Sequence, residues 1–346
     1  MNREPRRNEV GFTMIEMVMA TVMLLSLAFL VTSMIISGTD AQRFSDRLGR
    51  VTEISQDILA DMQRDLQAAV RVFDADTLGM SYRGRVAPWP QAVALASSKP
   101  SSIQVSSTFK KDVSGTEKTG NELLFARQAW SDSFTCTSGN AYRVDTYRVV
   151  YYYLRKEGVG PGKGSPHGLN LCKWVSEPLV NGAQVDAIAD ATDRTEVLKH
   201  LRDATPDDSG AKHSPLHVVW MVGEDPATSG TFRQILADGS MTTTPVLPRA
   251  NPWEIEREVK LSSSGMLHAT HYSVASNWSQ GNQGTGRFAI ANNTTASVGF
   301  PHGFEVQVVG PASARKVLVH LTLVSTNAKG LKAYYDAQVV TVVREG

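Results

Sequence analysis

The chain has 346 residues, a net charge of +1 and 42% hydrophobic residues. That length allows a membrane anchor followed by one large domain or two small ones. No stripe of Lys and Arg stands out along the chain, so nucleic acid is not an expected partner.

The first predicted element is an apolar transmembrane helix over residues 12–37. No charge follows Glu16 until Asp40, and the run from 17 to 36 is interrupted only by hydroxyl side chains, at Thr21, Ser26, Thr32 and Ser33. Twenty helical residues span about 30 Å, the thickness of a bilayer core. Three arginines precede the run, which predicts a cytoplasmic leader over residues 1–11 and export of the remainder across the inner membrane.

A single carboxylate, that of Glu16, lies near the start of this apolar run. A charge within a membrane segment is costly and is a functional hypothesis by default. A secretory signal peptide would be cleaved after the apolar stretch, whereas the small residue Gly11 lies before it. A plain membrane anchor would explain the apolar run but not Glu16.

Residues 11–16, Gly-Phe-Thr-Met-Ile-Glu, resemble the class III signal of type IV prepilins and secretion pseudopilins. The resemblance implies that a prepilin peptidase cleaves between Gly11 and Phe12 and that the new Phe12 amine is methylated. It also implies that Glu16 pairs with the Phe12 amine of a neighbouring subunit in the fibre, where a low dielectric strengthens such a pair. The alternative is that the Glu16 side chain only reaches to the membrane interface.

Beyond the membrane, an amphipathic helical pattern continues over residues 38–73. Apolar residues recur every three, four or seven positions, at Phe44, Leu48, Val51, Ile58, Met62, Leu66, Val70 and Phe73. Charged residues occupy the other faces. This pattern predicts one continuous helix whose second half packs on a soluble domain.

The pattern then changes to alternation with frequent turns, which predicts a β-rich periplasmic or surface domain over residues 74–346. The predicted strands are 103–107, 122–127, 142–155, 171–176, 217–222, 254–261, 266–275, 304–309, 316–325 and 333–343. We expect one hairpin from 142–155 and 171–176, a second from the last two strands, and a helix over 187–203. The fold class is α+β, a pilin-like long helix on a mainly antiparallel sheet, with 186–302 interpreted as an insertion or a second lobe.

Cys136 and Cys172 are the only cysteines. In an exported chain such a pair favours a disulfide, and the alternative is two buried thiols. A metal site is not expected, because neither cysteine has a CxxC partner. No arrangement of residues supports catalysis, so neither an enzyme nor a cofactor is expected.

Residues 58–69 and the terminal hairpin resemble PilW-type minor pilins, and residues 58–69 also resemble J-type pseudopilins. The resemblance implies a structural subunit of the type IV pilus tip that primes assembly and supports motility or adhesion. It would lie in the inner membrane before assembly and at the pilus tip or cell surface afterwards. The implied partners are the prepilin peptidase, other minor pilins and the major pilin through the N-terminal helix, and a tip adhesin.

Two other functions remain open from the sequence. One is a J-type pseudopilin of a type II secretion system, which would use the same N-terminal helix in a different machine. The other is a surface-displayed binding module, with Tyr82, Trp89 and the 186–302 region as its recognition surface. Aromatic side chains lie in the core more often than on a binding face, which weakens this second alternative.

Overall fold

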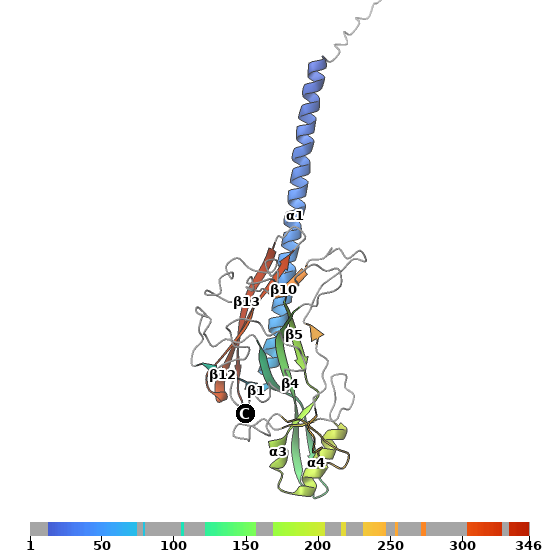
Figure 1. Cartoon of the computed structure of the whole chain (residues 1–346), viewed down its shortest axis with the longest axis vertical. Helices are drawn as coiled ribbons and strands as arrows, with labels where there is room; N and C mark the ends of the chain where they lie inside the picture. The colour runs from blue at the N-terminus through green and yellow to red at the C-terminus, as the bar shows by residue number, and fades with distance from the viewer. Residues whose placement is uncertain are drawn as a thin grey trace, which may run out of the picture. The chain divides into compact units, whose positions relative to one another are not determined.

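A computed structural model describes residues 13–74, 79, 105–106, 122–156, 169–204, 216–218, 231–246, 253–254, 271–274, 303–326 and 332–345. The chain divides into two compact units, Met1–Gly49 and Arg50–Gly346. Helix α1 (Met14–Gln67) begins in the first unit, and its last turns belong to the second, which also holds the sheet (Figure 1).

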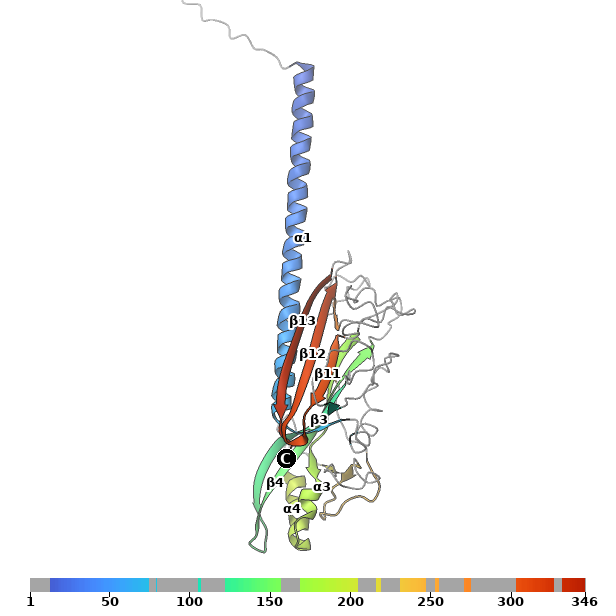
Figure 2. The same cartoon turned by 90° about the vertical axis from the view of Figure 1, so that its left-hand side faces the viewer.

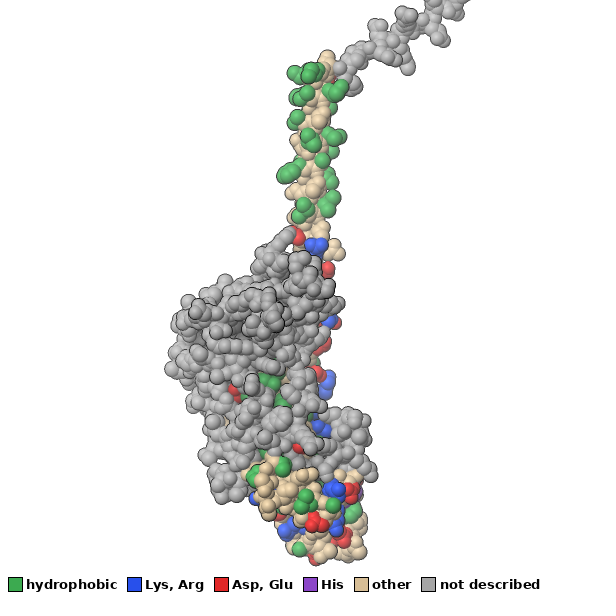
Figure 3. Space-filling view, turned by 45° about the vertical axis from the view of Figure 1, so that its right-hand side comes forward, with side chains coloured by type: hydrophobic (Ala, Val, Ile, Leu, Met, Phe, Trp, Pro, Cys, Tyr) green, Lys and Arg blue, Asp and Glu red, His purple; other side chains and the backbone are tan. Residues whose placement is uncertain are grey.

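From Met17 to Ile36, within the first unit, α1 carries apolar side chains on all sides. No Gly or Pro interrupts residues 14–37, so the helical hydrogen bonding is continuous there. Large hydrophobic side chains from Met14 to Ile36 are exposed, and they cover this part of the helix in Figure 3. Among the described residues, this is the one helix long and apolar enough to cross a membrane.

In the second unit, α1 becomes amphipathic, as predicted. Its buried side chains recur every three or four residues and join the sheet in one hydrophobic cluster; they are Val51, Ile54, Ile58, Leu59, Met62 and Leu66. The exposed positions of the same turns carry charges such as Glu53, Asp57 and Asp61. One face of the helix is therefore part of the core of this unit.

The predicted end of the helix at Phe73 is wrong. α1 ends at Gln67, and β1 (Ala69–Phe73) follows after one residue. β1 pairs antiparallel with β3 (Leu123–Thr135), and this pairing buries Ala69, Val72 and Phe73. The valines and Phe73 have side chains that suit a strand, and pairing with β3 outweighs their helical spacing.

Thirteen described strands form one mainly antiparallel sheet. Besides β1 and β3 they are β2 (Val105–Ser106), β4 (Ala141–Lys156), β5 (Leu169–Val175), β6 (Leu179–Asn181), β7 (Leu216–Val218), β8 (Arg233–Gln234), β9 (Trp253–Glu254), β10 (His271–Val274), β11 (Phe304–Val309), β12 (Arg315–Thr326) and β13 (Lys332–Val343). Only two of the pairings, β2 with β11 and β6 with β7, are parallel.

Both predicted hairpins are confirmed, because β4 pairs antiparallel with β5 and β12 with β13. β10 pairs with both β12 and β5 and so joins the C-terminal strands to the central ones. Since β10 lies within the range 186–302, that range is not wholly a separate lobe. The coarse α+β prediction, a long N-terminal helix with an antiparallel sheet, is confirmed.

The sheet is buried on both faces, and β4 shows this by alternation. Val150 and Tyr152 belong to the cluster that includes α1, which we call the helix-side cluster. Tyr151 and Tyr153 belong to a second cluster with Trp174, which we call the outer cluster. The C-terminal part of α1 runs beside β13 and β12 (Figure 2).

A third cluster lies between the β3–β4 hairpin and two helices, α3 (Gly182–Asp186) and α4 (Ala191–Ala204). We call this part of the second unit the lobe. The helix predicted over 187–203 begins later, at Ala191. The reason is a cap: Asp190 Oδ1 accepts hydrogen bonds from the backbone N–H groups of Thr192 and Asp193 at 2.7 and 3.0 Å.

Candidate functional site

Glu16 and Thr13 form reciprocal hydrogen bonds at the start of α1. Glu16 Oε2 accepts from the Thr13 backbone N–H at 2.9 Å and from the Thr13 hydroxyl at 2.8 Å, and the Glu16 N–H donates to Thr13 Oγ1 at 3.4 Å. This capping box satisfies backbone N–H groups that a helix N-terminus otherwise leaves open. The Thr-x-x-Glu spacing is the sequence signal for this motif, which we did not predict.

Several other polar side chains in and just after the apolar segment bond within the helix. Four hydroxyls each donate to the carbonyl four residues earlier at 2.7 to 2.8 Å, those of Thr21, Ser26, Thr32 and Thr39. In lipid, polar groups need such internal partners, because water cannot supply them. Glu16 is then the one charged side chain between residues 13 and 39. Its carboxylate lies where the helix dipole favours a negative charge.

The predicted processing site lies outside the described residues. Gly11 and Phe12 are the two residues of the expected cleavage, and the description of the chain starts at Thr13. Cleavage after Gly11 and methylation of Phe12 therefore stay predictions. Tyr82 and Trp89, named above for a recognition surface, also lie outside the described residues.

A buried ionic network fixes α1 on the sheet, at Asp65. Asp65 Oδ2 accepts a hydrogen bond from the Tyr152 hydroxyl at 2.6 Å and lies 2.6 Å from Lys173 Nζ, and Arg127 approaches Oδ1 at 3.6 Å. Burial and the Asp65 charge raise the pKa of Tyr152, which keeps its hydroxyl protonated as the donor. Buried charges need partners of this kind, so the network sets the position of the helix on β3, β4 and β5.

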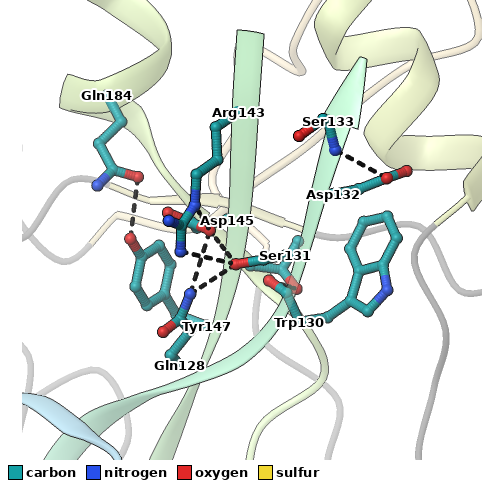
Figure 4. A network of polar contacts seen from close by, with 10 residues as sticks. Gln128, Trp130, Ser131, Asp132, Ser133, Arg143, Asp145, Tyr147 and Gln184 are labelled. Atoms are coloured by element: carbon teal, nitrogen blue, oxygen red, sulfur yellow. Dashed lines mark hydrogen bonds and ion pairs between the residues drawn. The ribbon is translucent and has the colours of Figure 1, made fainter.

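A second polar network lies on the lobe, across the paired strands β3 and β4 (Figure 4). Asp145 Oδ1 accepts from Ser131, from Gln128 at 3.1 Å and from Arg143 at 3.2 Å. Gln128 and Arg143 also donate to the Ser131 hydroxyl, at 2.6 and 3.3 Å. These groups bond to one another on an exposed face, which stabilises the hairpin.

The opposite face of the hairpin contacts a histidine of α4. His200 of α4 lies 2.9 Å from Asp132 Oδ2, and its ring stacks on Phe134 with the centroids 4.3 Å apart. The hydrogen bond from His200 lowers the pKa of Asp132. Consecutive residues of a strand point to opposite faces, so Ser131 cannot meet the His200–Asp132 pair. The three residues therefore do not form a catalytic triad.

The tip of the hairpin is tied to α4 by Asp193. Its Oδ2 accepts from Asn140 Nδ2 and from the Tyr142 hydroxyl, each at 2.8 Å, and its backbone carbonyl accepts from the Cys136 thiol at 3.7 Å. These hydrogen bonds lower the pKa of Asp193, the largest effect coming from Asn140. Burial and the nearby carboxylates raise the pKa of Cys136, which makes it a poor nucleophile.

The expected disulfide between Cys136 and Cys172 is not formed, and both thiols are buried. Cys136 N–H donates to the Asn140 carbonyl at the start of β4, whereas Cys172 is paired with Tyr153 near the other end of that strand. Thirteen residues of β4, from 141 to 153, span about 40 Å. A disulfide needs Cα atoms about 4–7 Å apart, so the alternative of two buried thiols holds.

Among the described residues, no group of three or more His, Cys, Asp or Glu side chains could hold a metal ion. The expectation of no metal and no cofactor stays a prediction, because that finding covers only part of the chain. The described residues thus contain an apolar helix with one carboxylate in the capping box at its start, a buried ionic network at Asp65 that holds the end of this helix on the sheet, and a polar lobe. No family model, no curated protein and no solved structure matches the chain.

Proposed function

We propose that the chain is a PilW-type minor pilin, a structural subunit that primes assembly of a type IV pilus from the inner membrane. The observation that carries the proposal is Glu16, the lone charge of an apolar helix, directly after a prepilin-like cleavage sequence. The capping box supports it, because it keeps the carboxylate at the N-terminal end of the helix. The protein then acts by assembly and not by catalysis.

The exposed side chains of α1 supply a physical route to assembly. In the membrane, lipid covers the apolar residues from Met14 to Ile36, and after extraction the helices of neighbouring subunits replace the lipid. A neighbouring Phe12 amine would then compete with Thr13 for the Glu16 carboxylate. Because an unpaired charge in this apolar setting is costly, that pairing would select one register between neighbours.

Crosslinking in cells tests the proposal, with a photoreactive residue at Phe44 or Leu48. Both side chains are exposed on α1, whereas Val51 and Met62 are buried and unsuitable as probe sites. Leu236, an equally exposed apolar residue of the lobe, is the matched control site. We expect helix probes to capture minor pilins and the major pilin, and the Leu236 probe to capture them at least several-fold less.

A Glu16→Ala variant gives the residue-level test in the same cells. We expect it to be cleaved normally and to lose these helix crosslinks by about tenfold or more, because the intersubunit charge pair is gone. Mass spectrometry of the mature N-terminus checks cleavage. Normal crosslinking and normal piliation with cleaved Glu16→Ala would overturn the proposal. Capture of secretion pseudopilins would instead assign the chain to a type II secretion fibre.

A further inference from the structure

Buried charges connect two edge strands of the described sheet, β1 and β13. Arg315, at the start of β12, lies 2.7 Å from Asp74 and 3.0 Å from Glu345. Glu345 Oε1 also accepts a hydrogen bond from the backbone N–H of Val72 in β1 at 2.9 Å. All three charged side chains are at most 12% exposed. We call Asp74, Arg315, Glu345 and the Val72 N–H the clasp.

The clasp joins segments that are far apart in the sequence. Val72 and Glu345 are separated by 273 positions, and they belong to the first strand of the sheet and to the residues that follow its last strand. Among the described strands, β1 pairs only with β3, and β13 pairs only with β12. The clasp therefore bridges two strands that share no backbone pairing.

Because β1 directly follows α1, the clasp connects α1 to the C-terminal strands. Only Ala68 separates the end of α1 at Gln67 from the start of β1, so displacement of the helix acts directly on β1. Backbone pairing with β3 holds one side of β1. Through Glu345 and Arg315, the clasp ties the end of β1 to β12 and to the chain after β13.

We propose that the clasp is a conformational lock that makes β1 and β13 open together, so that load on α1 reaches both of these edge strands. Its charges are interdependent, because Arg315 pairs with both carboxylates: loss of Glu345 leaves it with Asp74 alone, and loss of Arg315 removes the ion pair from both. Burial raises the pKa of Glu345, opposed by the Val72 hydrogen bond and by Arg315, so this carboxyl depends on its partners. These residues are distinct from those that carry the fibre proposal.

Hydrogen exchange of the full chain in detergent tests the lock, with Glu345→Gln as the main variant. This change removes the charge while leaving an oxygen that can accept from Val72. We expect the amides of β1 and β13 to exchange faster by a common factor of about tenfold or more. The amides that are hydrogen-bonded between β4 and β5 should keep their protection from exchange, since no clasp residue lies on those strands.

Lys316→Met is the matched control, because Lys316 follows Arg315 on β12 and is exposed. We expect it to leave exchange unchanged, and Arg315→Met to repeat the effect of Glu345→Gln more strongly. Faster exchange in only one of β1 and β13 would overturn the proposal. So would equal acceleration of β4 and β5, which would mean general destabilisation. If Arg315→Met does not fold, Glu345→Gln alone decides between these results.

Discussion

At the scale of single residues, Asp65 and Asp61 show how burial decides the worth of a charge. Both are aspartates of α1, one turn apart, and each has a cationic neighbour. The Asp65 side chain is 8% exposed and faces Lys173, whereas that of Asp61 is 59% exposed and pairs with Arg64. Water screens the second pair and not the first, so only the first can be critical for stability.

We therefore predict that Asp65→Ala lowers the free energy of unfolding by about 3–5 kcal/mol, because it leaves Lys173 buried without a counter-charge. Asp61→Ala, the control on the same helix, should cost less than about 0.5 kcal/mol. Urea unfolding followed by circular dichroism measures both values. Equal losses in the two variants would show that the network at Asp65 does not hold the helix on the sheet.

At the scale of elements, Asp193 ties α4 to the tip of the β3–β4 hairpin through two side-chain hydrogen bonds. Asp193→Ala removes the acceptor for Asn140 and Tyr142, so we predict that α4 separates more often from the hairpin tip. Cys136 reports this opening, because its buried thiol must be exposed before it reacts. We expect its alkylation rate in the native protein to rise about tenfold or more, consistent with the loss of two charge-assisted hydrogen bonds.

Cys172 is the internal control for that measurement, since it lies in the outer cluster and not in the lobe. Its alkylation rate should not change in Asp193→Ala, and mass spectrometry of the labelled peptides separates the two thiols. Faster labelling of both cysteines would contradict a local opening. The wild-type protein should also label Cys136 faster than Cys172, because the lobe is the smaller of the two packed regions.

The same scale shows what the sequence could predict. The last three strands were predicted to within one residue at each end, because they are rich in Val and other strand-forming residues and show no competing helical spacing. The end of α1 was not, because Leu66, Val70 and Phe73 fit a helix as well as a strand. Pairing with β3, more than fifty residues later, decides between the two, and local spacing carries no information about it.

In the candidate site, too, one part could be predicted from the sequence and another could not. Glu16 and its apolar helix are evident from sequence, because one charge in a long apolar run needs no tertiary information. The buried ionic network at Asp65 was not predicted, because its partners Arg127, Tyr152 and Lys173 come from three different strands. The disulfide was wrongly predicted for the same reason: the number of cysteines does not reveal that Cys136 and Cys172 lie beside opposite ends of β4.

At the scale of the whole molecule, the division into two units predicts that the second unit folds without the apolar segment of the first. The apolar segment from Met14 to Ile36 is exposed, so its removal takes nothing from the core of the second unit. The turns after Arg50 supply six buried side chains to that core, each worth roughly 1.5–3 kcal/mol. Their sum is on the order of 10 kcal/mol, comparable with the total stability of a domain.

We therefore predict that a fragment of residues 37–346 folds and unfolds cooperatively without detergent, whereas residues 68–346 do not fold. The first keeps the whole buried stripe of α1 together with Asp65, and the second loses both. Thermal unfolding by circular dichroism and the dispersion of amide resonances distinguish the two outcomes. A folded 68–346 fragment would mean that the sheet has a sufficient core of its own and that the helix is an accessory. Failure of 37–346 to fold would mean that the apolar segment contributes to the fold as well as to the membrane.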